Sequence, residues 1–465
     1  MKTRRILCSV AIAAAMAANA QNNGGITKDM LKDITAQPPM SQAQTALTNA
    51  IQHNGIELLA RGKAQLTPVP ATFSVETKKQ SIQNQKSSGR CWMFSGLNVL
   101  RGQFAQANPD KAVVFSQDYL FFWDQLEKAN LMLQGIIDTG KKDISDPEVQ
   151  FFFAAPISDG GTFCGVIDLV SKYGLVPQSV APETFSSEST SQMRRILSSK
   201  LREYALKLRR MVADGKKADA IKKEKTALLK DIYRMLSMAY GEPVREFRYA
   251  HVNAEGKTVG EEKTYTPLSF AEECGATNLD DRYLMVMNDP RNEYHKVYEI
   301  QYDRHTYDGH NWRYLNLPME EIEQLAIASL KDGQKMYSSY DTGKMLDRKR
   351  GFCSLQNFDY ANLFETQFPM TKAERLLTRD SGSTHAMTLT AVNLNADNKP
   401  DAWKVENSWG TESGQKGYLI MTEEWFKEYM FRLVVDKKYA TEAQLKQAQA
   451  KPVMLKYDDA LFEDE

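Results

Sequence analysis

Residues 85–94 read Gln85-Lys86-Ser87-Ser88-Gly89-Arg90-Cys91-Trp92-Met93-Phe94, and this stretch is the strongest local indication of the fold. Apolar residues continue after Cys91 with helical spacing, which predicts a helix that begins at or near the cysteine. The positive end of a helix dipole and adjacent backbone donors lower the pKa of a thiol placed there. Because the thiolate is the nucleophile in cysteine catalysis, Cys91 is a candidate catalytic residue. On position alone, however, a buried structural cysteine is the better interpretation.

Gln85 is a candidate partner of this cysteine, because it lies six residues before Cys91. A loop of that length can return the amide side chain to the backbone N–H of Cys91. The two groups would then donate hydrogen bonds to the oxyanion of a tetrahedral intermediate. A cysteine nucleophile also needs a base and a residue that orients the base.

His385 and Asn407 are the candidates for these two roles. His385 begins a β-like run, and Asn407 follows 22 residues later at the end of another. The carbonyl of an asparagine side chain can accept from one imidazole nitrogen and leave the other facing a thiol. Trp409 is placed to cover that hydrogen bond and exclude water. Each residue alone is more simply a satisfied polar group at a strand end, but the order Gln, Cys, His, Asn favours a catalytic set.

The same segments resemble a known family, the bleomycin hydrolase and bacterial aminopeptidase C branch of the papain-like cysteine peptidases. The resemblance is carried by Gln85…Gly89-Arg90-Cys91-Trp92, Thr384-His385-Ala386-Met387 and Val405-Glu406-Asn407-Ser408-Trp409-Gly410. Further similar stretches are Asp159-Gly160-Gly161 and residues 172–177, 288–291, 370–376 and 416–419. The similarity extends from about residue 70 to residue 440.

The resemblance implies an α+β fold with a papain-like two-lobed core. One lobe is helical, the other is β-barrel-like, and helical and hook-like insertions enlarge this core. It assigns Cys91 as nucleophile, His385 as general base and acid, Asn407 as orienting residue and Gln85 as oxyanion donor. It also implies that the backbone of Gly161 holds the substrate chain. Peptides are the implied substrates, no cofactor is implied, and the implied assembly is a homohexamer with its active sites facing an inner chamber.

Composition shifts and the resemblance together predict the organisation of the chain. The expected segments are a signal peptide at 1–20, an arm at 21–70, a helical lobe with Cys91 at 71–190, an insertion at 191–333, a β lobe with His385 and Asn407 at 334–440, and a tail at 441–465.

The tail decides which kind of peptidase is expected. In the resembling family it enters the cleft, and its terminal carboxylate meets the free amine of the substrate. Here the usual Trp-Asp-Pro-Met-Gly stretch is absent and the end is acidic, at Glu463, Asp464 and Glu465. We expect the tail to enter the cleft still, where Glu465 attracts a substrate ammonium. A frayed tail would instead leave an open cleft and an endopeptidase.

The N-terminus predicts export. Lys2, Arg4 and Arg5 precede an apolar run from Ile6 to Ala18, and Ala18-Asn19-Ala20 is typical of a signal peptidase site. The run is too short to span a bilayer. We therefore expect a periplasmic or extracellular protein with no membrane attachment.

Charge gives no indication of a nucleic-acid partner, since Lys and Arg together number 59 and so do Asp and Glu. One helical pattern, residues 190–236 with a break at Asp214-Gly215, is strongly basic. It lacks interleaved aromatic residues and any groove-binding motif. A solvated helical face or a subunit contact is therefore favoured over a nucleic-acid surface.

Other chemistry is less well supported. His305 and His310, with Asp303 and Asp308, lack the spacing of a helical metalloprotease motif, so no metal site is expected. Cys164, Cys274 and Cys353 are expected to be buried, inert thiols, although one disulfide among them remains open. A papain-fold binding protein without turnover is the alternative from another functional class.

Overall fold

The computed structural model describes residues 24–462, so the predicted signal peptide and Glu465 lie outside the described residues. The chain forms two compact units that divide between Arg61 and Gly62. In the smaller unit, three helices follow one another: α2 (Lys28–Thr35), α3 (Gln42–His53) and α4 (Ile56–Leu59). Helix α3 begins with a capping box, in which the side chains of Ser41 and Gln44 each accept from the other's backbone N–H.

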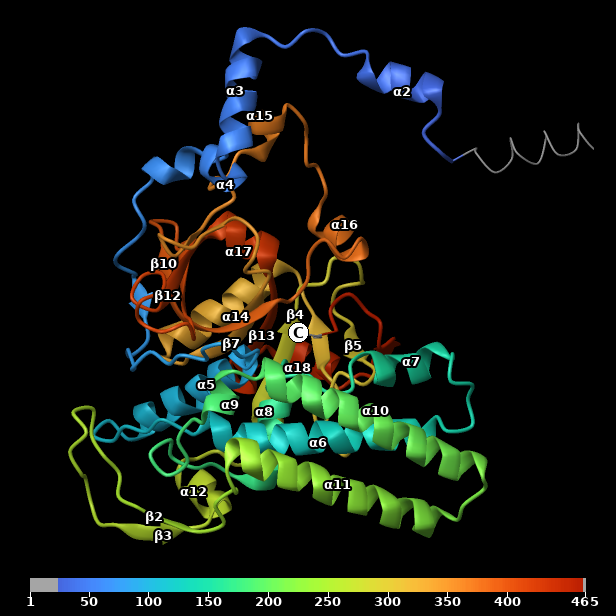
Figure 1. Cartoon of the computed structure of the whole chain (residues 1–465). Coiled ribbons are helices and arrows are strands. Elements are labelled where there is room, and N and C mark those ends of the chain that lie inside the picture. Colours follow the sequence, from blue (N-terminus) through green and yellow to red (C-terminus); the bar gives the residue numbers. More distant parts are fainter. Residues whose placement is uncertain (1–23, 463–465) are drawn as a thin grey trace, which may run out of the picture. The chain divides into compact units, whose positions relative to one another are not determined.

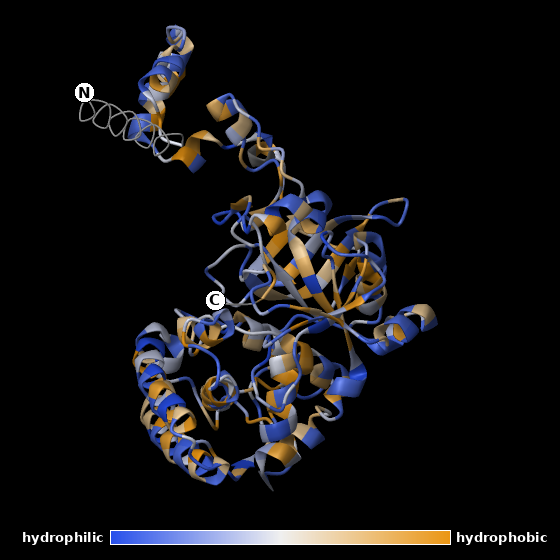
Figure 2. Ribbon diagram, turned by 90° about the vertical axis from the view of Figure 1, so that its right-hand side faces the viewer, coloured by the Kyte–Doolittle hydropathy of each residue, from blue (hydrophilic) through white to orange (hydrophobic). Residues whose placement is uncertain are grey.

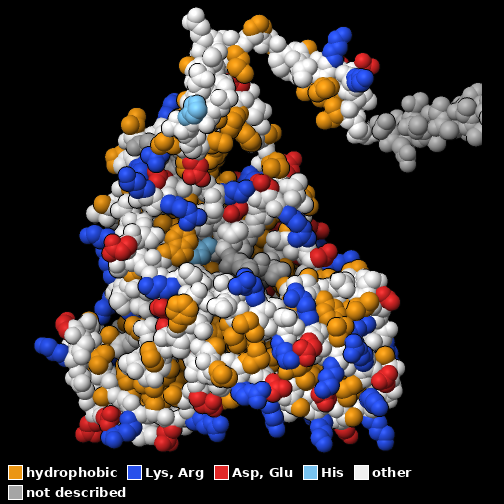
Figure 3. Space-filling view, in the orientation of Figure 1, with side chains coloured by type: hydrophobic (Ala, Val, Ile, Leu, Met, Phe, Trp, Pro, Cys, Tyr) orange, Lys and Arg blue, Asp and Glu red, His pale blue; other side chains and the backbone are white. Residues whose placement is uncertain are grey.

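Helices make up the first half of the larger unit. After the 3-10 turn η1 (Lys63–Leu66) and the short strand β1 (Val75–Glu76), they are α5 (Cys91–Ala107), α6 (Gln117–Asp138), α7 (Pro147–Ala154), α8 (Phe163–Tyr173), α9 (Phe185–Glu188), α10 (Ser191–Ala213) and α11 (Ala218–Tyr240). Helices α10 and α11 form the helical pair predicted around Asp214-Gly215, and both pack along α6 (Figure 1). Lys and Arg side chains project from the surface that α11 forms, interspersed with Asp and Glu (Figure 3).

A hairpin and two short helices lead from this half into the sheet. Strands β2 (Phe247–Tyr249) and β3 (Lys263–Tyr265) form an antiparallel hairpin, and α12 (Pro267–Glu273) and α13 (Leu279–Arg282) follow it. Helix α12 begins with proline at its first position and a capping box at Thr266, which together define its start.

A twelve-stranded mixed sheet forms the second half. Its order is β14 (Val453–Leu455), β5 (Val297–Ile300), β6 (Arg313–Asn316), β4 (Tyr283–Met287), β13 (Met430–Asp436), β7 (Met336–Tyr340), β10 (His385–Leu394), β11 (Pro400–Glu406), β12 (Tyr418–Thr422), β9 (Phe352–Cys353) and β8 (Leu346–Asp347), with β1 paired to β10. The helices of this half are α14 (Met319–Lys331), α15 (Tyr360–Phe364), α16 (Lys372–Leu377), α17 (Glu423–Tyr429), α18 (Glu442–Ala448) and the 3-10 turn η2 (Lys437–Tyr439). Apolar residues follow the strands of the sheet in Figure 2, and the buried core of this half gathers on these strands and on α14.

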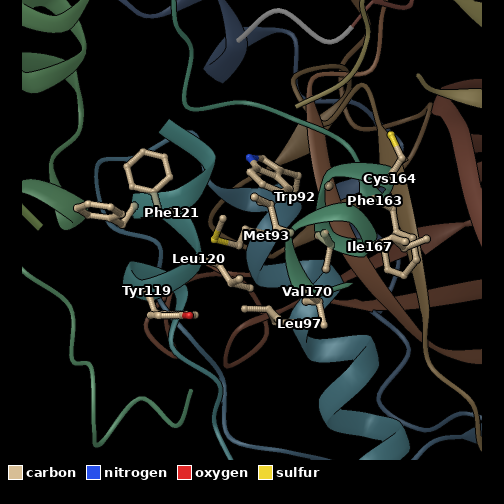
Figure 4. Packing of buried hydrophobic residues seen from close by; sticks show 14 of the residues in the cluster. Trp92, Met93, Leu97, Tyr119, Leu120, Phe121, Phe163, Cys164, Ile167 and Val170 are labelled. Atoms are coloured by element: carbon tan, nitrogen blue, oxygen red, sulfur yellow. The ribbon is translucent and has the colours of Figure 1, made fainter. Parts of the chain in front are cut away.

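The helical half and the sheet meet along α5. This helix packs against β10 and β7 on one side and against α8 and α6 on the others. Figure 4 shows Trp92, Met93 and Leu97 among the side chains of α6 and α8, such as Leu120 and Val170. The packing places the beginning of α5 at the junction of the two halves, and the expected α+β class is confirmed.

The sheet crosses the boundary that the sequence suggested at residue 333. Strands β4, β5 and β6 come from the expected insertion, yet they belong to the same sheet as β7, β10 and β11. Strand β4 pairs with β13, whose residues lie about 150 positions later in the chain. None of the described helices has the length and apolar character needed to cross a bilayer.

Candidate active site

Cys91 is the first residue of α5, as the helical spacing predicted, and only 1% of its surface is exposed. The loop before Cys91 is bonded to the loop that begins at Asp159, since the backbone N–H of Gly89 donates to Oδ2 of Asp159 over 2.7 Å. Arg90 is completely buried and forms an ion pair with Glu183 at 2.8 Å. The thiol therefore begins a helix whose preceding loop is fixed by buried polar contacts.

His385 begins β10, and the thiol of Cys91 lies beside the head of that strand. The backbone N–H of Ala386 donates to Sγ of Cys91 over 3.4 Å. Since β10 and β11 are antiparallel neighbours, the residue that follows β11 reaches the first residue of β10. That residue is Asn407, and its Oδ1 lies 2.8 Å from Nε2 of His385.

The hydrogen bonds of Asn407 define the tautomer of His385. Oδ1 of Asn407 also accepts from the backbone N–H of Ser408 at 2.8 Å, which identifies this atom as the carbonyl oxygen. Nε2 of His385 must then carry the proton that it donates, and Nδ1 carries a lone pair. The ring of Trp409 stacks on the imidazole with centroids 4.8 Å apart, which shields the hydrogen bond from water.

Burial keeps the imidazole neutral. Desolvation lowers the pKa of His385 from its ordinary value of 6.5 to about 4, the hydrogen bond to Asn407 opposes this, and the charge of Arg348 adds to it. At neutral pH the resting imidazole is therefore a base that can accept a proton on Nδ1.

Gln85 is joined to the segment that carries Asn407. Its Oε1 accepts from Oγ of Ser408 at 2.5 Å, and its backbone N–H donates to the carbonyl of Ser408 at 2.8 Å. Nε2 donates one hydrogen to the carbonyl of Ser88 at 2.6 Å. An amide nitrogen carries two hydrogens, so this bond uses only one of them. Sequence reasoning missed the part that Ser408 takes in orienting the glutamine, although its place next to Asn407 was a signal.

Gly161 lies in the loop from Asp159 to Thr162, across from the cysteine loop. The indole N–H of Trp92 donates to the carbonyl of Asp159 at 2.9 Å, so the residue after Cys91 is bonded to this loop. A Cβ on Gly161 would lie 2.0 Å from Cε1 of His305 and 2.9 Å from the ring of Trp92. Only glycine fits at this position, because the imidazole and the indole both pack against its α-carbon.

The described part of the tail runs along the sheet toward these loops. Strand β14 pairs in parallel with β5 at the edge of the sheet. The carbonyl oxygen of Ala460 would be 3.4 Å from a Cβ on Gly382, three residues before His385. Phe462 lines a cavity of about 80 Å³ together with Gly160 and Gly161. The tail thus lies against the loop before His385, and Phe462 shares a cavity with the Gly161 loop.

Several arginines hold the tail in this course. The carboxylate of Asp459 forms an ion pair with Arg291 at 2.9 Å and accepts from the backbone N–H of Leu461 at 2.8 Å. Arg379 donates to the carbonyl of Asp458, and Arg432 donates to the carbonyl of Leu461. Leu461 is completely buried, which makes the tail part of the core at this point.

Residues 25–461 match the Peptidase C1-like family. The chain belongs to that family. It is 37% identical to aminopeptidase G of Lactobacillus delbrueckii subsp. lactis, over 94% of this chain and 99% of the relative. It is 34% identical to human bleomycin hydrolase, over 92% and 95% of the two chains. The crystal structure of PepW from Lactobacillus rhamnosis superposes with a TM-score of 0.89 at 34% identity, and the match covers 94% of this chain and 99% of that one.

Membership of the Peptidase C1-like family makes the chain a cysteine-type peptidase, as the sequence predicted. The papain-like α+β architecture is confirmed with it. The cysteine, histidine, asparagine and glutamine singled out in the sequence all lie within one network of hydrogen bonds and backbone contacts at the junction of α5 and the sheet.

The histidines and aspartates considered as a metal loop are dispersed in this peptidase. His305 pairs with Asp124, and Asp308 pairs with Lys172. His310 lies beside Asp168 and Asp280, with ligand atoms within 4.8 Å of one another. Nδ1 of His310 already bonds Asp168 at 2.6 Å, so the described geometry is that of a hydrogen-bonded pair.

The other three cysteines that the structure describes are buried and unoxidised: Cys164, Cys274 and Cys353. Burial raises the pKa of each, to about 12 for Cys274. Thiols of this kind are poor nucleophiles at neutral pH.

Proposed function

We propose that this protein is a cysteine aminopeptidase, which removes N-terminal residues from peptides through an acyl-enzyme on Cys91. The observation that carries the proposal is the course of the tail. Ala460 lies against Gly382 in the loop before His385, and Phe462 lines one cavity with Gly161, so we infer that the tail occupies one end of the region that an extended substrate would need. Its relatives include proteins named aminopeptidase and bleomycin hydrolase.

The chemistry follows from the assigned side chains. Nδ1 of His385 accepts the thiol proton as Sγ of Cys91 attacks the scissile carbonyl, and the imidazolium then gives that proton to the leaving amine. The second amide hydrogen of Gln85 and the backbone N–H of Cys91 stabilise the oxyanion. Water, deprotonated by the same imidazole, releases the acid and regenerates the thiol. Asn407 keeps the imidazole in the required tautomer throughout.

Two further groups contact the substrate in this proposal. The amide and carbonyl of Gly161 hydrogen-bond the peptide main chain, as strands do in a ladder. Trp409 covers the His385–Asn407 bond and forms part of the surface against which the peptide lies. Both assignments place substrate between the helical half and the sheet.

The acidic end of the tail selects free N-termini. Phe462, the last described residue, lines the same cavity as Gly161, and three acidic residues follow it in the sequence. The carboxylates of Glu463, Asp464 and Glu465 attract the ammonium of a substrate whose N-terminal residue occupies the site. A peptide that extends past this point would collide with the tail.

A pair of matched peptides tests the proposal, one with a free and one with an acetylated N-terminus. We expect cleavage of the free peptide to exceed that of the acetylated one at least tenfold, and deletion of residues 458–465 to remove most of the difference. Equal cleavage of both peptides by the intact chain would establish an endopeptidase with an open cleft. Persistent cleavage by Cys91→Ala would refute a cysteine mechanism, whereas absence of cleavage by the wild type would leave a papain-fold binding protein.

We further propose that the protein is exported and that it assembles into a homo-oligomer, a hexamer as in the resembling family. Export is supported by the basic start, the apolar run and Ala18-Asn19-Ala20. Assembly is supported by apolar side chains exposed on helices of both units, such as Met30, Ile34 and Met238. N-terminal sequencing of the secreted protein and light scattering of the purified enzyme test the two statements separately.

A further inference from the structure

A buried charged network lies behind the loop of Gly161, and the catalytic chemistry does not use it. Helix α6 contributes Asp124 and Lys128, one turn apart, with their charged atoms 2.9 Å from each other. The loop after β5 contributes His305, whose Nδ1 lies 2.5 Å from Oδ1 of Asp124. Asp124 is completely buried, and the side chains of His305 and Lys128 are 3% and 10% exposed.

Each member of the network is bonded, directly or through its neighbour, to the backbone of residues 158–162. Nζ of Lys128 donates to the carbonyl of Gly160 at 2.5 Å and reaches that of Ser158 at 3.3 Å. The backbone N–H of Thr162 donates to Nε2 of His305 at 3.1 Å. The indole N–H of Trp92 donates to the carbonyl of Asp159, which lies between Ser158 and Gly160. The loop is therefore held at residues 158, 159, 160 and 162, on both sides of one residue.

That residue is Gly161. Among the described residues, no hydrogen bond is recorded for its amide or its carbonyl, whereas the residues on both sides of it are bonded. His305 fills the space behind its α-carbon, and the rings of His305 and Trp92 lie with centroids 4.4 Å apart. Backbone groups of a rigid loop beside a cleft are commonly satisfied by a ligand or by water.

The tautomer of His305 is as constrained as that of His385. Nε2 accepts from the Thr162 amide, so it carries a lone pair, and Nδ1 must carry the proton donated to Asp124. Asp124 is kept ionised although burial alone would raise its pKa, because Lys128 and His305 together lower it. The charge on Lys128 therefore stabilises the carboxylate, the carboxylate fixes the imidazole, and the imidazole fixes Thr162.

We propose that Lys128, Asp124 and His305 are positioning residues for peptide hydrolysis. They hold residues 158–162 so that the amide and carbonyl of Gly161 stay available to hydrogen-bond the peptide main chain. The inference rests on the proposed function, since it needs a peptide at Gly161. It assigns to three residues far from Cys91 in the sequence a part in substrate binding rather than in the chemistry of the thiol.

Two variants of the full-length enzyme test the network. Lys128→Met keeps the apolar stem and removes the ammonium, and Asp124→Asn keeps the shape and removes the charge. With a free-amine peptide, we expect KM to rise about tenfold and kcat to stay within about twofold, because a hydrogen bond made equally in the ground and transition states is lost. The rate at which iodoacetamide alkylates Cys91 should stay within about twofold, since that small reagent does not need Gly161.

A matched control separates positioning from general stability. Lys225 also donates to α6, at Asn130 and Gln134, but forms no hydrogen bond or ion pair with the loop among the described residues. Lys225→Met should leave KM unchanged. His305→Gln, which keeps an acceptor, should recover most of the affinity that His305→Ala loses. If Asp124→Asn does not fold, the Lys128→Met variant and the two His305 variants still test the proposal.

Two results would overturn the inference. One is an unchanged KM in Lys128→Met and in both His305 variants. The other is a parallel fall in kcat and in the alkylation rate, which would mean that the network supports Cys91 through Trp92. Assaying cleavage by Cys91→Ala tests the proposed function alone. Failure of the proposed function can therefore be distinguished from failure of the positioning role.

Discussion

Oγ of Ser408 donates a 2.5 Å hydrogen bond to Oε1 of Gln85 and so joins the residue after Asn407 to the loop before Cys91. The bond joins the sheet to the helical half, and its acceptor is the oxygen of the glutamine amide. The nitrogen must then face the other way, toward Ser88 and the site. One hydroxyl therefore determines which end of the Gln85 amide is the donor to the oxyanion.

We expect Ser408→Ala to lower kcat about tenfold without a comparable change in KM, because the amide of Gln85 loses the partner that orients it. Gln85→Ala should cost about 100-fold, the usual worth of one oxyanion donor. The double variant should be no slower than Gln85→Ala, since Ser408 acts only through the glutamine. Additive losses in steady-state kinetics would show that Ser408 contributes independently.

The ion pair between Asp459 and Arg291 should control exopeptidase specificity. Asp459→Asn removes the charge that faces Arg291 but keeps an acceptor for the N–H of Leu461. We expect cleavage of an acetylated peptide to rise about three- to tenfold relative to the free peptide, because the proposed position of the tail in the cleft is then held less firmly. Asp458→Asn is the control, since that residue bonds Arg379 through its backbone carbonyl. If the ratio of acetylated to free peptide cleavage is the same in both variants, the ion pair does not control the position of the tail.

Acid should destabilise the wild type more than His385→Gln. The pKa of His385 is about 4 when folded, against about 6.5 when unfolded, so the unfolded chain binds a proton first as the pH falls. The folded state therefore loses stability between about pH 6.5 and pH 4, by up to about 3 kcal/mol from this group, and no further below that window. Thermal melts of both proteins at pH 7 and pH 4.5 measure the difference. Equal acid sensitivity would indicate that the resting site holds a Cys91 thiolate and an imidazolium.

Alkylation at pH 7 should modify one cysteine among those described. Burial raises the pKa of Cys164, Cys274 and Cys353, while Cys91 begins a helix beside a neutral imidazole. Mass spectrometry of the native protein after iodoacetamide should show one adduct that maps to Cys91 and disappears in Cys91→Ala. An adduct on any of the other three would show that the core admits the reagent.

Local pattern was sufficient for the individual elements. Helical spacing located the start of α5 at Cys91 and the turn between α10 and α11, because these signals act over a few residues. The pairing of strands was not accessible in this way. Strands β4 to β6 were predicted to be part of an insertion, because the local sequence of a strand does not determine which strand it pairs with.

His305 shows the same limit for a single side chain. Beside Asp303 and Asp308 it suggested a weak metal loop, and its true partners, Asp124 and Thr162, lie more than 140 positions earlier. The contact of Asp459 with Arg291 and that of Ser408 with Gln85 span 168 and 323 positions. No periodicity in the chain predicts such contacts.

By itself the sequence determined the chemistry of this protein: a thiol at a helix start, an imidazole and an amide at strand ends, and a glutamine one loop earlier. These choices are local, because the reactivity of a group depends on its residue type and on the element that carries it. Tertiary structure alone decided which side chains hold those groups in place, where the tail lies, and what stands behind Gly161. These depend on packing between distant segments, where burial and hydrogen-bond satisfaction select the partners.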